Sequence, residues 1–179
     1  MRRRHRAAAA TAVAAAVAAV GVATWQLSTG RDELRYADDY ARHEPLRVVG
    51  YPSVGSLRLT QEVVWRLADG SSGELADLAT SDGSAAEAKA TAANWVRSFQ
   101  QGATGPVAAE FHDEGSVRQT VVLYFERTGQ VKQLNLRLDG NAGSDGWRVQ
   151  LREPDPKVAA APPTWAPATP GGPLPPTRP

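Results

Sequence analysis

The sequence predicts an α+β domain in which two to three helices pack on one face of a four-stranded, curved antiparallel sheet. Apolar residues recur at helical spacing between positions 58 and 101 and then alternate with polar residues from 106 to 151. The alternating runs are separated by short segments rich in Gly, Asn and Asp, which suit hairpin turns. Helices followed by sequential hairpins are typical of this fold class.

The helical part divides into three segments, each with its own start or stop signal. The segments are residues 58–68, 74–79 and 84–101. Thr60 is a candidate cap for the first segment, and Gly70 and Gly102 are candidate stops for the first and the last. Ser84 and Glu87 have the spacing of an S-x-x-E capping box, which predicts the start of the longest helix.

Four strands are expected at residues 106–114, 117–127, 131–138 and 147–151. One face of these strands is apolar throughout, and it comprises Val107, Ala109, Phe111, Val121, Leu123, Phe125, Leu134, Leu136, Leu138, Trp147, Val149 and Leu151. The other face is largely polar. Because each strand has one apolar and one polar face, we expect the sheet to be covered on a single side.

Residues 1–30 have the order of a signal anchor or transmembrane segment. Four basic residues precede an uncharged, Ala-rich run, and they are Arg2, Arg3, Arg4 and Arg6. The positive-inside rule then places the N-terminus in the cytoplasm and the remaining chain outside the cell membrane of a bacterium, with Trp25 at the outer interface. Because Ala buries little apolar area, cleavage after Ala23 and secretion is the alternative.

The regions that flank the predicted domain differ from it in composition. Residues 31–57 carry mixed charges and are expected to form a stalk or linker, in which Pro45 ends any helix. The domain itself is expected to span residues 58–153. Ten of the thirteen prolines fall within residues 154–179, which predicts a disordered, extended tail.

Composition excludes several classes of function. The chain carries 20 basic and 19 acidic residues, and without the N-terminal arginines the balance is mildly acidic. A chain with no basic stripe lacks the electrostatic footprint of nucleic-acid binding. The absence of cysteine excludes disulfides, thiol nucleophiles and zinc-thiolate sites.

The sequence predicts no catalytic, cofactor-binding or metal-binding residue, and hence no enzyme. No ionisable group is expected on the apolar face of the sheet, where a general acid or base would meet a substrate. The acidic cluster around His112, comprising Glu110, Asp113 and Glu114, lies on the polar face beside Arg118 and indicates solvated charges. A possible apolar pocket would be lined by Trp65, Trp95, Phe99, Phe111 and Trp147, which otherwise belong to the core.

The order of elements over residues 58–153, with the longest helix directly before the sheet, resembles the nuclear-transport-factor-2-like (NTF2-like, cystatin-like or SnoaL-like) superfamily. It also resembles membrane-anchored VirB8-like or conjugation-associated extracytoplasmic proteins built on that fold. The resemblance implies a pocket on the side of the sheet that faces the helices. It identifies no functional residue, because the superfamily has no motif that fixes activity.

These observations predict a non-catalytic, membrane-anchored extracytoplasmic module that binds a protein partner or a second copy of itself. The polar face of the sheet, with Arg118, Arg137, Arg148 and Arg152 against Glu110 and Glu126, is the expected contact surface. One alternative is a SnoaL-like small-molecule binder or enzyme with a cavity between the helices and the sheet. Another is a component of a conjugation or secretion apparatus.

Overall fold

The computed structural model describes residues 33, 35–113, 115–139 and 146–175. The chain forms two compact units, of which the first ends at Arg42 and the second comprises His43–Pro179. In the first unit residues 35–42 are helical, and the helix ends before Pro45 as predicted. The expected membrane segment, with Arg2, Arg3, Arg4, Arg6 and Trp25, lies outside the described residues. Among the described residues no helix is both long and apolar enough to span a bilayer.

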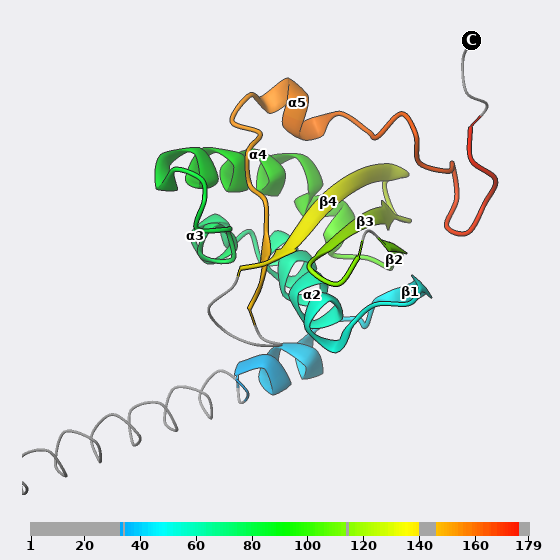
Figure 1. Cartoon of the computed structure of the whole chain (residues 1–179), viewed down its shortest axis with the longest axis horizontal. Helices are drawn as coiled ribbons and strands as arrows, with labels where there is room; N and C mark the ends of the chain where they lie inside the picture. The colour runs from blue at the N-terminus through cyan, green and yellow to red at the C-terminus, as the bar shows by residue number, and fades with distance from the viewer. Residues whose placement is uncertain (1–32, 34, 114, 140–145, 176–179) are drawn as a thin grey trace, which may run out of the picture. The chain divides into compact units, whose positions relative to one another are not determined.

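The second unit has the predicted α+β architecture (Figure 1). Its elements follow the order β1 (Arg47–Gly50), α2 (Val54–Ala68), α3 (Ser72–Asp77), α4 (Ala85–Ala103), β2 (Val107–Asp113), β3 (Arg118–Phe125), β4 (Gln130–Leu138), β5 (Trp147–Val149) and α5 (Pro156–Ala160). The five strands lie in the order β1-β2-β3-β4-β5. The last four strands pair antiparallel, as predicted, whereas β1 pairs parallel with β2.

The sheet is therefore mixed and five-stranded, and the expectation of four antiparallel strands is wrong in this respect. The additional strand β1 lies within residues 31–57, which the composition suggested to be a stalk or linker. Its four residues are too few to show an alternating pattern. Its partner β2 lies about sixty residues later in the chain, so only the tertiary structure brings the two together.

Local side-chain chemistry explains where the two long helices begin. Helix α2 starts at Val54 because the Ser53 hydroxyl accepts a hydrogen bond from the Ser56 amide at 3.1 Å. The predicted cap Thr60 is instead inside the helix, where its hydroxyl donates to the Ser56 carbonyl at 2.7 Å. Helix α4 starts as predicted, since the Ser84 hydroxyl accepts from the Glu87 amide at 3.1 Å.

Gly102 lies inside α4 and does not stop it, contrary to the sequence-based expectation. A Cβ atom at this position would lie 2.7 Å from the Cβ of Phe125 and 2.8 Å from the Thr128 hydroxyl oxygen. Glycine is thus required for close approach of the helix to the end of β3, a role that sequence cannot distinguish from a helix stop.

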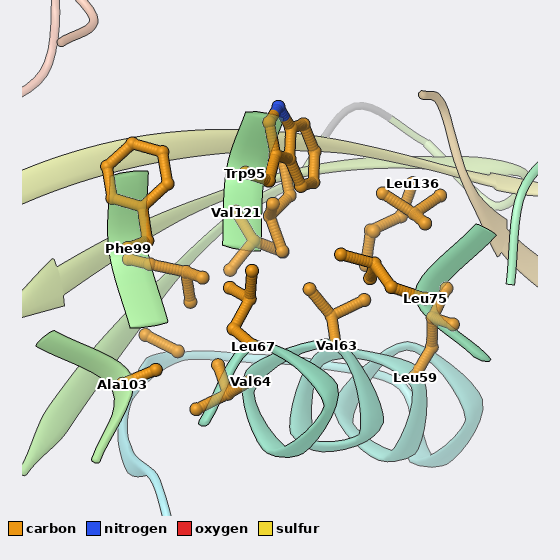
Figure 2. Packing of buried hydrophobic residues seen from close by; sticks show 14 of the residues in the cluster. Leu59, Val63, Val64, Leu67, Leu75, Trp95, Phe99, Ala103, Val121 and Leu136 are labelled. Atoms are coloured by element: carbon orange, nitrogen blue, oxygen red, sulfur yellow. The ribbon is translucent and has the colours of Figure 1, made fainter. Parts of the chain in front are cut away.

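The core lies between the sheet and the helices α2, α3 and α4. Figure 2 shows the side chains of α2 pointing toward those of α4 and of the sheet. All twelve residues predicted for the apolar face of the sheet contribute, with Leu138 only partly buried at the margin. The inner face of the sheet is thus the face that the alternation predicts.

Residues 154–175 pack on the second unit, and the prediction of a disordered tail is wrong for them. Helix α5 packs against α4, with Ala159 fully buried. Farther along the tail, drawn in orange and red in Figure 1, Ala166 packs against Ala108, Val122 and Tyr124 on the opposite side of the sheet. Proline prevents strand pairing, yet an irregular segment can still bury small apolar groups, which composition does not indicate. The sheet is therefore covered on both faces.

Candidate functional site

The five aromatic residues considered for an internal pocket are core residues in the structure. Trp95, Phe99, Phe111 and Trp147 belong to the hydrophobic cluster between helices and sheet. Trp65 is also buried, and its indole stacks on the His43 ring with centroids 5.5 Å apart. The side chains that were candidates for lining a cavity instead pack against neighbouring residues.

Lys132 is an ionisable residue on the inner face, where none was expected. It is only 2% exposed, and its ammonium contacts the Glu153 carboxylate and lies 4.6 Å from the centroid of the Trp95 ring. The Trp95 indole donates to the same carboxylate at 2.8 Å. Strand alternation could have revealed this residue, because Lys132 has the same parity as the inward-facing Leu134 and Leu136.

The Lys132–Glu153 pair has a structural role. Burial lowers the pKa of Lys132, and the hydrogen bond that its ammonium donates to Glu153 opposes this shift. The Glu153 amide also donates to the Thr91 hydroxyl at 2.8 Å, and Asn94 donates to the Pro154 carbonyl at the same distance. These contacts hold the segment between β5 and α5 on α4, and they set the direction in which the tail leaves the core.

Glu110 anchors the tail on the outer face of the sheet. This residue is 8% exposed, and its carboxylate accepts hydrogen bonds from the Tyr124 hydroxyl at 3.0 Å and from the Gly171 amide at 3.1 Å. The Tyr124 hydroxyl also lies 3.3 Å from the Pro167 carbonyl. Burial, followed by the contact with Glu110, raises the pKa of Tyr124 well above its ordinary value, so the hydroxyl remains a donor.

Trp165 forms a second anchor of the tail. Its indole nitrogen donates to the Gln133 side-chain carbonyl at 2.7 Å, and its ring meets the His112 ring edge-on with centroids 5.0 Å apart. The tail therefore crosses the outer face from β4 to β1, because Gly171 also lies near Val49. Composition gave no signal for this role of Trp165.

The expectation that the cluster of Glu110, His112, Asp113 and Glu114 consists of solvated charges is wrong for Glu110, because the tail covers this residue. The His112 Nε2 atom lies 3.8 Å from the Glu110 carboxylate, beyond hydrogen-bond distance. Glu114 lies outside the described residues. In the part of the chain that the structure describes, no three His, Asp or Glu side chains are grouped as metal ligands would be.

A groove of about 460 Å³ lies between the tail and the sheet. It is lined by Arg47, Tyr124, Phe125, Glu126, Gly129, Gln130, Val131, Ala168, Thr169 and Pro170. Arg47 and Glu126 form an exposed ion pair at 2.8 Å. The groove shows that the tail is less closely packed at residues 168–170 than at its two anchors.

Two of the arginines expected to face a partner form ion pairs within the chain. Arg137 and Arg152 both contact the Asp82 carboxylate, at 3.2 and 2.7 Å. A hydrogen bond with Thr80, followed by one with Arg152, lowers the pKa of Asp82 below its ordinary value. Together with the cover over Glu110, these pairs leave the outer face a poorer candidate for partner binding than the sequence suggested.

The two edges of the sheet differ in their availability. The outer edge of β5 is closed by the segment after α3, since the Thr80 amide donates to the Val149 carbonyl and the Val149 amide to the Leu78 carbonyl, each at 3.0 Å. At the other end, β1 is the last strand among the described residues. Beside it Tyr51 is 97% exposed and Val54 87% exposed.

No family model, curated protein or solved structure matches this chain in the comparisons with known proteins. The resemblance to the NTF2-like superfamily thus stays a prediction from the order of elements.

Proposed function

We propose that this chain is a non-catalytic protein-interaction module, anchored in the cytoplasmic membrane by its N-terminal segment and exposing its second unit outside the cell. The observation that carries the proposal is that β1 is the edge strand of the sheet in the part of the chain that the structure describes, with exposed apolar side chains beside it. An exposed strand edge presents unpaired backbone donors and acceptors, to which an extended segment of another protein can add as a further strand.

The side chains around this edge favour the same conclusion. Val48 lies on β1 and is partly exposed, and Tyr51 and Val54 follow it along the chain. Covering large apolar groups in such exposed positions lowers the free energy of a complex, and Tyr is enriched at interfaces. Because Leu78–Thr80 close the β5 edge, strand addition is directed to β1.

An enzyme or small-molecule binder with a cavity between helices and sheet is less well supported. That interior is occupied by the apolar cluster, and its lysine is enclosed in an ion pair with Glu153. A role in a conjugation or secretion apparatus would differ from the proposed function only in the identity of the partner, which the following experiment addresses.

A photo-crosslinking amino acid introduced at position 51 or 54 of the full-length chain, in intact cells, tests the proposal. We expect a discrete cross-linked product from both positions, with the partner identified by mass spectrometry. Position 89, on an exposed part of α4, is the matched control and should give no such product.

The substitution Val48→Lys should reduce the cross-linked product at position 51, because a charged side chain on an edge strand opposes strand addition. Val158→Lys, at another exposed apolar position, should not reduce it. If positions 51 and 54 yield no more product than position 89 under all growth conditions, the proposed function is wrong.

A further inference from the structure

The outer face of the sheet has the features of a peptide-binding site, and this inference is independent of the proposed function. Its present occupant is the tail segment 165–171, which contacts residues of four strands. The contacts involve Gln133 on β4, Tyr124 on β3, Glu110 on β2 and Val49 on β1. In the described part of the chain this segment consists of bends and a turn and is not a strand of the sheet, so side chains of the face determine what binds.

Each contact selects a particular chemical feature of the bound segment. Gln133 accepts the indole N–H of Trp165, and the floor formed by Ala108, Val122 and Tyr124 accommodates the small side chain of Ala166. The Tyr124 hydroxyl lies at the carbonyl of Pro167. These features describe a segment with the sequence Trp-Ala-Pro, whose proline limits the entropy lost on binding.

The fourth contact shows that the face is built for an occupant. The Glu110 side chain is only 11% exposed, and the Gly171 amide supplies one of its two hydrogen bonds. Without the tail, a charged group in the middle of an apolar floor would lose both this donor and part of its cover. An unoccupied face is therefore unfavourable, whichever copy of the chain provides the tail.

We propose that this face binds the tail of a second copy of the chain in exchange for its own. The sequence complementary to the face is present in every copy, so exchange preserves each contact. The hinge is residues 161–164, Ala-Pro-Pro-Thr, which follow α5, and its first residue Ala161 is extended. Its prolines have no N–H to donate, and residues 161, 162 and 164 are exposed, so few interactions oppose a change in its direction.

Tethering determines when the exchange occurs. A short linker gives the chain's own tail an effective concentration on the order of millimolar at the face. Dilute wild-type chains therefore bind their own tails. Exchange dominates when one copy has a damaged tail and the other a damaged face, because neither can then form the intramolecular contact.

Two full-length variants create this situation. The tail-damaged variant Trp165→Ala/Ala166→Asp loses the indole and introduces a charge over the apolar floor, but keeps the face. The face-damaged variant Glu110→Ala/Gln133→Ala loses two acceptors, but keeps the tail. The chain has no cysteine, so a single introduced cysteine can be labelled specifically. Leu174→Cys in the face-damaged variant and Lys89→Cys in the tail-damaged variant are each labelled with one fluorophore of an energy-transfer pair.

We expect energy transfer when the two variants are mixed, and none when the tail-damaged variant is paired with a face-damaged variant that also carries Trp165→Ala. A synthetic peptide of residues 161–175 should compete with the tail and abolish the energy transfer. The same peptide with Trp165→Ala should require an about tenfold higher concentration, which corresponds to a loss of roughly 1.4 kcal/mol in binding free energy. Circular dichroism of each variant checks that it is folded.

If folded variants show no energy transfer on mixing, tail exchange between copies is disproved, while the proposed function at the β1 edge is unaffected. Energy transfer that is insensitive to the wild-type peptide would also contradict the proposal, because it would show association through another surface. Direct binding of the fluorescent peptide to the tail-damaged variant, weakened at least tenfold by adding Glu110→Ala, provides an independent test.

Discussion

The two faces of the sheet are both covered, but by different means. On the inner face, three helices contribute large apolar side chains to one continuous core. On the outer face, a single segment without regular secondary structure rests on a small apolar floor and is held by a few polar contacts to Glu110, Tyr124 and Gln133. Apolar burial dominates the stability of a domain, whereas individual hydrogen bonds contribute modestly. The inner face should therefore determine whether the unit folds, and the outer face should determine what it binds.

The largest expected effect is on the inner face. Phe99→Ala removes a fully buried ring that stacks on Phe125 at 5.3 Å, and it should lower the free energy of unfolding by about 3–5 kcal/mol. Chemical denaturation measures the change, and Val158→Ala at an exposed position should cost less than about 0.5 kcal/mol. If Phe99→Ala lowered the free energy of unfolding by less than an outer-face variant does, the inner face would not dominate the stability of the unit.

The ion pair on the inner face provides the next test. Glu153→Ala leaves the buried Lys132 ammonium without its counterion and should cost about 3 kcal/mol. Lys132→Met removes the charge and keeps an apolar side chain of similar length. It should change the free energy of unfolding by less than about 1 kcal/mol, because Glu153 keeps its hydrogen bond from the Trp95 indole and remains partly accessible to solvent. Equal losses in the two variants, measured by denaturation, would mean that the pair contributes as a unit.

On the outer face, Trp165→Ala should lower global stability by only about 1 kcal/mol, since the indole is partly exposed and loses one hydrogen bond. Its larger effect should be local. Hydrogen exchange of the Gly171 amide, which is bonded to Glu110, should become faster in this variant, while amides of β3 remain protected. Unchanged exchange at Gly171 would show that Trp165 is not an anchor of the tail.

The smallest expected effect is at Asp82, outside both faces. Because Thr80 and Arg152 lower its pKa, Asp82 stabilises the folded state fully above its ordinary pKa and loses this contribution as the pH falls through the lowered value. The melting temperature of the wild-type chain should therefore fall more steeply than that of Asp82→Asn between about pH 5 and pH 2. Asp77→Asn, on the exposed side of α3, should follow the wild-type curve.

Some residues of the candidate sites could have been placed from sequence patterns and others could not. Lys132 could have been assigned to the inner face, because strand parity alone puts it beside Leu134. Trp165 could not have been assigned, because its partners Gln133 and His112 lie in strands more than thirty residues earlier and no periodicity connects them. Nor does the composition of residues 31–57 indicate that four of them complete the sheet.

The sequence by itself determined the α+β class, the four antiparallel strands, the apolar inner face and the start of α4 at Ser84. These features depend on local periodicity and on side-chain bonds between residues three or four positions apart, which the order of amino acids records directly. Only the tertiary structure decided that β1 joins β2, that β5 is closed at its edge and that a proline-rich segment covers Glu110. Each of these depends on contacts between distant parts of the chain, whose free energy arises only when the folded sheet brings those parts together.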